Sequence, residues 1–532
     1  MRRSARQPLA FARSPRDRAR PRMVARAGRL LFLAFWLALA VAVAVVLVWS
    51  GRGRPRAELL TPLEVVGRKT PVTIALHAGR PGVRSYEVRL DTADGPHRVA
   101  SDEVPRPGWL GSGIRESQLQ VTIEPAAIGV GEGDARLVVL ADENSPVGWM
   151  RGRGEVLSVP VSIDLTPPKV TLLSGQQRIA LGGSAIAVYD ASPDTARSGV
   201  EVGPAFFPGR TGDAPSASVY VALFAVPHDA DARVVPKVVA EDRAGNRREV
   251  PVPSIIKPKR FPTEEIVLTD DFLRVKVPDL ISQNGLVAPA DPVEGYLLVN
   301  RELRRSTEER VREICRESAP RPLFDGAFLQ QPGTAVGSRF AERRTYRYNG
   351  RVIDEQTHLG TDLASVKQDP VVAANSGTVL FTGNLGIYGN AIVVDHGLGL
   401  ESLYAHLSQI GVAPGQAVAR GDTIGRTGDT GLAGGDHLHF SVLVDGVHVD
   451  PVEWWDGKWI RDHVAPELAV AAAAGAKAAP AASAAAPGAP AAAAPAAAAP
   501  AAADAAAAGG AAPGARPAAT PGPSASGAGA AP

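Results

Sequence analysis

The chain of 532 residues contains a single cysteine, Cys315, so no disulfide can form within it. Cysteine usage therefore says nothing about the cellular compartment, although one thiol could still pair between two chains. The net charge at pH 7 is only +2, and charges of both signs are scattered along the sequence. Nucleic-acid-binding proteins usually carry a concentrated basic face, so we expect no nucleic acid as a partner. The sequence also lacks a phosphate-binding P-loop and a Gly-x-Ser-x-Gly nucleophile elbow.

The N-terminal part predicts a membrane anchor. Residues 1–29 carry ten arginines and one acid, Asp17, and residues 30–50 contain no charge. About twenty apolar residues are enough to cross the roughly 30 Å hydrocarbon core as a transmembrane helix. The arginine excess places residues 1–29 in the cytoplasm and everything after about residue 51 outside. A cleaved signal peptide is the alternative, but the apolar run is long and is followed by a poor cleavage site. Both interpretations export the rest of the chain.

A chain of this length is expected to form several domains, and the next two are predicted to be β-sandwiches spanning 57–165 and 166–256. Short alternating runs broken by glycine and proline indicate strands with one buried face. A polar turn at 241–246 is similar to those of bacterial immunoglobulin-like modules. Whether the sandwiches act as spacers, bind a partner or cover the catalytic groove stays open. The strands are expected at 72–76, 119–123, 137–140, 159–163, 169–173, 219–223 and 234–240.

Residues 257–320 are interpreted as a connecting segment that contains a helix. Ser306-Thr307-Glu308-Glu309 has the pattern of a capping box, which predicts a helix from Ser306 to about Glu317. Cys315 is expected to be a partly buried small residue of this helix.

The C-terminal residues 467–532 are nearly all alanine, proline, glycine and serine. Alanine favours helix, but the recurring prolines interrupt it. Because almost nothing large and apolar is available for burial, we predict a disordered tail.

Four of the ten histidines lie in three short motifs between residues 358 and 440, and Asp362 follows the first of them by four residues. His437 and His439 alternate along a predicted strand, so their side chains are expected to face the same way. Two such imidazoles repel each other when protonated and are costly to bury, whereas a metal ion holds its ligand neutral. Two imidazoles and one carboxylate form a familiar catalytic zinc set that leaves a position for water. Singly, His358, Asp362 and His406 have structural explanations, but together the motifs indicate a metal site.

The order and spacing of these motifs resemble the LytM/lysostaphin-type zinc peptidases (peptidase family M23), which hydrolyse peptide cross-links in bacterial peptidoglycan. The resemblance covers about a quarter of the chain and implies a glycine-rich antiparallel β catalytic domain at 321–466. The matching motifs are His358-Leu359-Gly360-Thr361-Asp362, 370–379, Gly389-Asn390, Asp395-His396-Gly397, 404–408, 421–425, 428–431, His437-Leu438-His439-Phe440 and Val449-Asp450-Pro451.

The resemblance implies one Zn²⁺ per chain, bound by His358, Asp362 and His439. It also implies that His406 and His437 flank the open position and handle protons. One would deprotonate or orient the water, and the other would stabilise the oxyanion or protonate the leaving amine. Which histidine acts as the base stays open.

Other residues of this domain complete the expectation. The chain has no His-Glu-x-x-His motif, so a glutamate base is not indicated. Ser441 and Gly434-Gly435-Asp436 depart from the family pattern without removing a ligand. His396 and His448 are expected to be non-catalytic.

The implied whole is a mainly β, single-pass protein of the bacterial inner membrane, with its C-terminal domains in the periplasm or outside the cell. Its implied activity is zinc-dependent hydrolysis of peptidoglycan stem peptides or cross-bridges in wall remodelling or division. Peptidoglycan is the expected partner, and other cell-wall or division proteins are further candidates. The alternative is a non-enzymatic LytM-type regulator of another hydrolase, but such proteins lack some site residues, and here all five are present. The scissile bond, the oligomeric state and any inhibition by residues 257–357 stay open.

Overall fold

A computed structural model describes residues 20–50, 55–79, 82–103, 114–144, 146–212 and 218–478. Helix α1 (Arg20–Ser50) contains the apolar run, and residues Gly28–Val45 have a mean hydropathy of 2.2 with none of the window buried. By length and composition the helix can cross a membrane, although a signal sequence would pass the same test. It begins ten residues before the predicted span. Most of the basic segment lies outside the described residues.

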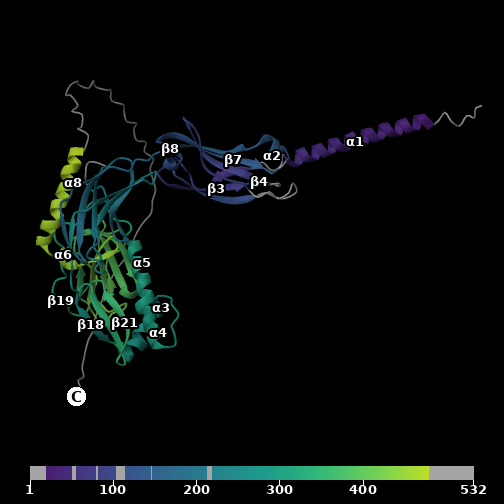
Figure 1. The fold of residues 1–532 in the computed structure, drawn as a ribbon. Helices are drawn as coiled ribbons and strands as arrows, with labels where there is room; N and C mark the ends of the chain where they lie inside the picture. Colours follow the sequence, from purple (N-terminus) through teal and green to yellow (C-terminus); the bar gives the residue numbers. More distant parts are fainter. Residues whose placement is uncertain are drawn as a thin grey trace, which may run out of the picture. The chain divides into compact units, whose positions relative to one another are not determined.

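The first module has two sheets around one core, in agreement with the predicted β-sandwich (Figure 1). All four predicted strands form, and inward side chains such as Ile74 and Leu137 are fully buried. One sheet has the order β1-β3-β6, with β1 (Arg56–Leu59), β3 (Thr70–His77) and β6 (Glu116–Ile123). The other has the order β2-β8-β7-β4-β5, with β2 (Val65–Val66), β4 (Val83–Thr92), β5 (Gly95–Glu103), β7 (Gly133–Glu143) and β8 (Gly154–Ile163). The short α2 (Pro146–Arg151) joins β7 to β8.

The second module is also built from β-sheets. The predicted turn forms, because Asp242 Oδ1 accepts a hydrogen bond from the Asn246 backbone N–H at 2.9 Å. The strand predicted at 234–240 begins later, at Lys237. The sheets have the orders β14-β11-β9, β13-β12-β15-β16 and β10-β17. The strands are β9 (Val170–Leu172), β10 (Gln177–Ala180), β11 (Ser184–Ala191), β12 (Thr195–Val202), β13 (Ala205–Pro208), β14 (Val219–Ala225), β15 (Lys237–Asp242), β16 (Arg247–Pro251) and β17 (Ser254–Lys257).

The connecting segment contains more helices and strands than predicted, and the predicted capping box at Ser306 does not form. A continuous helical segment begins at Pro292, capped by Asp291, whose carboxylate accepts a hydrogen bond from the Val293 N–H at 2.9 Å. Ser306 lies inside it, and its hydroxyl donates to the Leu303 carbonyl at 3.0 Å. Local sequence could not show that the residues before Ser306 are already helical. The segment comprises β18 (Thr263–Val267), η3 (Phe272–Lys276), α3 (Val277–Gln283), α4 (Pro292–Leu297), η4 (Leu298–Leu303) and α5 (Arg304–Ile314). Cys315, predicted to be partly buried, is fully buried.

The C-terminal domain is organised on an eight-stranded sheet with the order β19-β22-β30-β26-β25-β24-β28, in which β31 pairs with β30. Its pairings are antiparallel, as predicted. These strands are β19 (Ala335–Ser338), β22 (Thr361–Ala364), β24 (Gly377–Asn384), β25 (Asn390–Asp395), β26 (Leu400–Ala405), β28 (Ala417–Val418), β30 (Leu438–Val444) and β31 (Val447–Val449). Two smaller sheets, β18-β20-β21 and β23-β29-β27, add β20 (Glu342–Tyr348), β21 (Arg351–His358), β23 (Pro370–Val372), β27 (Gln409–Ile410) and β29 (Thr423–Arg426), with the short η5 (Gly386–Tyr388) between β24 and β25.

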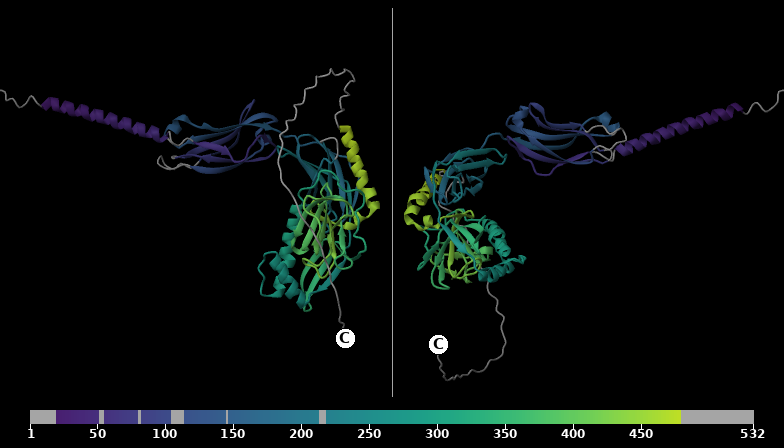
Figure 2. Two further views of the ribbon diagram at one scale, coloured as in Figure 1. Left: turned by 180° about the vertical axis from the view of Figure 1, so that it is seen from behind. Right: turned by 60° about the horizontal axis from the view of Figure 1, so that its bottom comes forward.

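The start of the predicted disordered tail is wrong for residues 467–478. After α6 (Pro451–Trp455), α7 (Gly457–Trp459) and η6 (Ile460–Val464), helix α8 (Ala465–Ala478) packs against β11 and β14 of the second module (Figure 2). Its apolar side chains join the core there, and Glu467 accepts from Gln177 at 2.9 Å. Pro466 is the second residue of α8, and the next proline is Pro480, so no proline interrupts the rest of the helix. Residues 479–532 lie outside the described residues.

The second module and the C-terminal domain share one hydrophobic core. Glu453 accepts a hydrogen bond from the Ser184 N–H at 3.0 Å, and Trp454 donates to the Ser184 hydroxyl at 3.2 Å. Arg210 forms an ion pair with Asp445, and both side chains are about nine-tenths buried. The module is therefore a packed support of the domain that carries the histidine motifs.

Candidate metal centre

Three predicted metal ligands meet where β21 ends and where β22 pairs with β30. Asp362 lies directly opposite His439 in the antiparallel register, and His358 is the last residue of β21. His358 Nε2 is 3.0 Å from Asp362 Oδ1 and 2.9 Å from His439 Nδ1, while His439 Nδ1 is 3.1 Å from Asp362 Oδ1. Among the described residues, this is the one group of three or more such side chains whose spacing suits a metal ion.

The remaining hydrogen bonds orient both imidazoles. His358 Nδ1 lies 3.3 Å from the Arg339 carbonyl, which accepts only, so Nδ1 carries the proton. Ser441 donates its hydroxyl hydrogen to the Leu359 carbonyl, so its oxygen accepts from His439 Nε2–H at 3.0 Å. Nε2 of His358 and Nδ1 of His439 are then unprotonated, and their lone pairs converge with a carboxylate oxygen. Three lone pairs facing one another repel unless a cation lies between them, so these residues fit a metal ion.

The two histidines predicted to handle protons lie beside this group. His406 follows the end of β26 with a left-handed backbone (φ 62°), held by hydrogen bonds from its N–H to the Tyr388 carbonyl and from Nδ1–H to the Thr430 carbonyl. His437 donates Nδ1–H to the Gly435 carbonyl at 2.8 Å, and its Nε2 is 3.5 Å from Asp362 Oδ1. The two rings are 4.9 Å apart. Both histidines therefore keep Nε2 as the nitrogen without a backbone partner.

Burial and the neighbouring carboxylate shift the pKa values of these imidazoles in opposite directions. Burial, reinforced by His437 and His439, holds the pKa of His406 well below its ordinary value. Burial also lowers the pKa of His439, to about 4. Burial alone would lower the pKa of His437, but its contact with Asp362 and that carboxylate's charge outweigh burial and raise the pKa. The site thus combines imidazoles that favour the neutral form with one that favours the charged form.

Several residues support the site beyond the five predicted to bind the metal or handle protons. Arg344 of β20 donates from Nη2 to Asp362 Oδ2 at 3.0 Å, the oxygen that faces away from the imidazoles. The Tyr388 ring lies 5.1 Å from the His439 ring. Gly360 leaves the space that His439 needs, since a Cβ there would lie 2.4 Å from His439 Nε2. Nothing in the sequence distinguishes Arg344 from other arginines, whereas Ser441 was noticeable as a departure from the family pattern.

His396 and His448 lie outside the metal-binding group. His396 is fully buried, with Nδ1 2.7 Å from the Ser376 carbonyl and Nε2 2.7 Å from the Ser402 hydroxyl. His448 Nε2 is 2.9 Å from Glu308 of α5. These contacts give both histidines a structural explanation.

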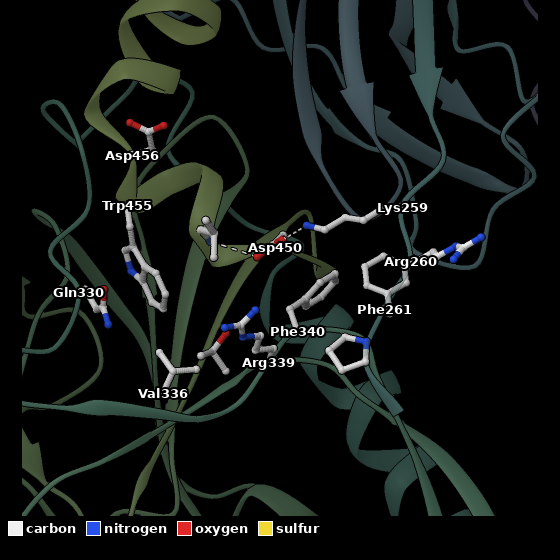
Figure 3. Close-up of a pocket in the computed structure, with 13 residues that line it drawn as sticks. Lys259, Arg260, Phe261, Gln330, Val336, Arg339, Phe340, Asp450, Trp455 and Asp456 are labelled. Carbon is white, nitrogen blue, oxygen red and sulfur yellow. Dashed lines mark hydrogen bonds and ion pairs between the residues drawn. The ribbon is translucent and has the colours of Figure 1, made fainter. Parts of the chain in front are cut away.

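Two cavities lie on opposite faces of β22. A cavity of about 320 Å³ on the Asp362 face is lined by all five predicted site residues. A larger cavity of about 830 Å³ lies on the Thr361 face, between residues 259–262 and the C-terminal domain (Figure 3). Figure 3 shows Asp450 bonded to Lys259 there, with aromatic rings of Phe340 and Trp455 in the wall. This larger cavity contains none of the five residues, so the smaller one is the candidate for chemistry.

Residues 356–451 match the model of peptidase family M23. The DD-carboxypeptidase/endopeptidase Mpg of Neisseria meningitidis is 38% identical over 133 residues, which are 24% of this chain and 31% of that protein. The peptidoglycan DD-endopeptidase ShyA of Vibrio cholerae is 38% identical over 118 residues, which are 22% of this chain and 27% of that protein. Among solved structures, the catalytic domain of lysostaphin from Staphylococcus simulans aligns at 28% identity, covering 23% of this chain and 92% of that chain with a TM-score of 0.20. The chain thus spans less than a third of the length of these two curated relatives.

Proposed function

We propose that the peptidase family M23 domain of this chain is a zinc-dependent endopeptidase that hydrolyses peptide bonds in peptidoglycan stem peptides or cross-bridges. The observation that carries the proposal is the convergence of His358 Nε2, Asp362 Oδ1 and His439 Nδ1, beside which His406 and His437 keep their Nε2 atoms free of backbone partners. The names of the matched relatives support peptidoglycan as the substrate.

The three converging residues would hold one Zn²⁺. When bound, such an ion acts as a Lewis acid and lowers the pKa of water toward about 7. Ser441 and the Arg339 carbonyl keep the two ligand imidazoles in the required tautomer and orientation. Arg344 fixes the Asp362 carboxylate by its outer oxygen, which leaves the inner oxygen directed at the imidazoles.

His406 and His437 would move protons at their Nε2 atoms. The Thr430 and Gly435 carbonyls hold the opposite nitrogens as donors, so each Nε2 can accept a proton from water or return one to the leaving amine. A protonated Nε2 can also donate to the oxyanion of the tetrahedral intermediate. The backbone contacts fix both rings before substrate binds, so the reaction does not include the entropy cost of ordering them.

The second candidate is a non-enzymatic regulator that activates another peptidoglycan hydrolase. One relative at 35% identity over 136 residues is named a lipoprotein NlpD/LppB homologue, from Pseudomonas aeruginosa. The enzyme remains the better supported reading, because all five site positions are filled and oriented in one cavity.

We further propose that α1 anchors the protein in the bacterial inner membrane as a single pass. Under this proposal the modules that follow lie in the periplasm or outside the cell, where peptidoglycan is found. The arginines at 1–29 would stay in the cytoplasm by the positive-inside rule.

The test compares the full chain in detergent with His439→Ala, His437→Ala and the control His77→Gln, an exposed histidine of β3. Zinc content and the release of soluble fragments from purified peptidoglycan are measured for each. We expect about one zinc per chain and cleavage in the native protein and the control. Both site variants should lose cleavage, and only His437→Ala should keep zinc. Zinc without cleavage of any wall preparation would favour the regulator, and absence of zinc would refute the enzyme.

A further inference from the structure

Arg304, the first residue of α5, is a half-buried cation without a carboxylate partner. Its Nε and Nη2 atoms donate to the backbone and side-chain oxygens of Asn300 at 3.2 and 2.7 Å, and both of these acceptors are neutral. Within the described residues, no acid lies at ion-pair distance from its guanidinium, and Nη1 has no partner. Glu308, one turn further along α5, instead directs its two oxygens to Tyr388 and His448. The charge of Arg304 acts on the Glu308 carboxylate at a distance, but no carboxylate contacts the guanidinium directly, so Arg304 can still form a charge-assisted hydrogen bond with a ligand.

Arg304 also lies where two cavities meet. It lines the metal cavity and a second cavity of about 250 Å³, which we name the connector pocket. The pocket is built mostly from the connecting segment, and its wall is apolar and aromatic. The two cavities share five lining residues, so they lie next to each other. The shared residues are Ile266, Arg304, Arg344, Leu432 and Gly434, and the pocket's apolar wall includes Leu268, Phe272, Tyr296 and Tyr346.

The other cation at this junction, Arg344, is already engaged by three carboxylates. Arg344 donates to Asp362 and to Glu342, and Glu264 lies 3.7 Å from the Arg344 guanidinium. Arg304 is therefore the cation available to a ligand. Its free Nη1 can donate to an anionic oxygen of the ligand, and the apolar wall can contact a hydrocarbon stem that carries this oxygen.

We propose that Arg304 and the connector pocket recognise a free carboxylate on the peptide next to the bond placed at the metal centre. This rests on the proposed function and deepens it, because it names a substrate class: peptides with an apolar stem and an unamidated carboxylate beside the scissile bond. The selecting element lies outside residues 356–451, so the connecting segment, rather than the M23 match, sets this preference.

The experiment uses the full chain in detergent and two synthetic branched peptides that differ in one group beside the scissile bond, a free carboxylate or its carboxamide. Affinities are measured by calorimetry and cleavage by chromatography. We expect the native protein to bind the carboxylate peptide about 10- to 100-fold more tightly, as for other hydrogen bonds between ionised groups. Arg304→Gln should reduce the ratio of the two affinities to about 1, because it should weaken binding of the carboxylate peptide alone.

Two further variants keep the test independent of folding. Arg305→Gln is the matched control, because Arg305 is exposed and paired with Glu302 and Glu309 on the same helix. Gly434→Asp places a negative charge at the junction without a steric clash, since a Cβ there meets no atom within 4 Å. This substitution should weaken binding of the carboxylate peptide and leave binding of the carboxamide peptide unchanged.

The outcomes separate this proposal from the proposed function. A native protein without preference, or a preference that survives both Arg304→Gln and Gly434→Asp, would overturn the carboxylate site even if both peptides are cleaved. An equal loss of affinity for both peptides in these two variants would also overturn the carboxylate site. A binding preference that disappears in both variants while neither peptide is cleaved would support the site and count against the hydrolase.

Discussion

Arg344 and Asp362 form an ion pair in which Nη2 donates to Oδ2 at 3.0 Å, while Oδ1 of the same carboxylate faces His358 and His439. The two carboxylate oxygens therefore have different tasks, one structural and one directed at the candidate metal position. Arg344 comes from β20, outside the residues that match family M23. The element that precedes the family domain thus contributes directly to its site.

We expect Arg344→Gln to weaken zinc binding about 10- to 100-fold, because Asp362 would lose the partner that fixes its orientation. Zinc affinity can be measured by competition with a chromophoric chelator. The neighbouring Arg343→Gln is the control, since Arg343 is exposed and lies on the same strand. Equal zinc affinity in Arg344→Gln and the native protein would show that the ion pair does not support the ligand.

Acid should destabilise the fold through His396. Burial lowers the pKa of this imidazole to about 4, against an ordinary value of about 6.5. Between pH 6.5 and 4 the unfolded chain binds a proton here and the folded chain does not, so protonation favours unfolding in that window. Stability should fall by up to about 1.4 kcal/mol per pH unit, or about 3 kcal/mol in total, and be unaffected by this group above pH 6.5.

Urea unfolding midpoints at pH 7.5, 6 and 5, with zinc in excess, measure this effect. In His396→Gln the acid-dependent loss should shrink, whereas the exposed His77→Gln should keep the native slope. The same slope in His396→Gln as in the native protein would assign acid sensitivity to other groups.

The second module should be required for the stability of the M23 domain. Arg210 pairs with Asp445 in a nearly buried site, and the charge of Asp395 also acts on Arg210. Arg210→Met would leave these carboxyl groups without their cation, at a cost of about 3 kcal/mol or more. Denaturant unfolding followed by tryptophan fluorescence should show an earlier transition. Arg210→Met combined with Asp445→Leu should recover part of the loss, whereas Arg233→Gln, in an exposed pair, should change nothing.

The sequence predicted the mainly β architecture well because alternation of apolar residues is a local signal. Each strand expected in the two sandwiches forms, with end shifts of a few residues. The connecting segment was predicted poorly, because its helices begin where no local pattern is decisive. Ser306 shows the reason: a serine followed by glutamate three residues later looks the same at a helix start and inside a helix. Tertiary packing also extended order through α8, where local composition suggested none.

By itself, the sequence indicated a metal site, because the three implied ligands, His358, Asp362 and His439, and the two histidines implied to handle protons, His406 and His437, are concentrated in recognisable motifs. Only the tertiary structure decided how they are oriented and what supports them. Arg344 contacts Asp362 from β20, and the Arg339 carbonyl contacts His358 from the residues before β20. Ser441 lies two residues from His439 on β30, but the distant Leu359 carbonyl orients its hydroxyl, and Arg304 lines the same cavity from a helix. Such contacts join residues distant in the chain. No spacing rule encodes them, since they depend on how strands and helices pack.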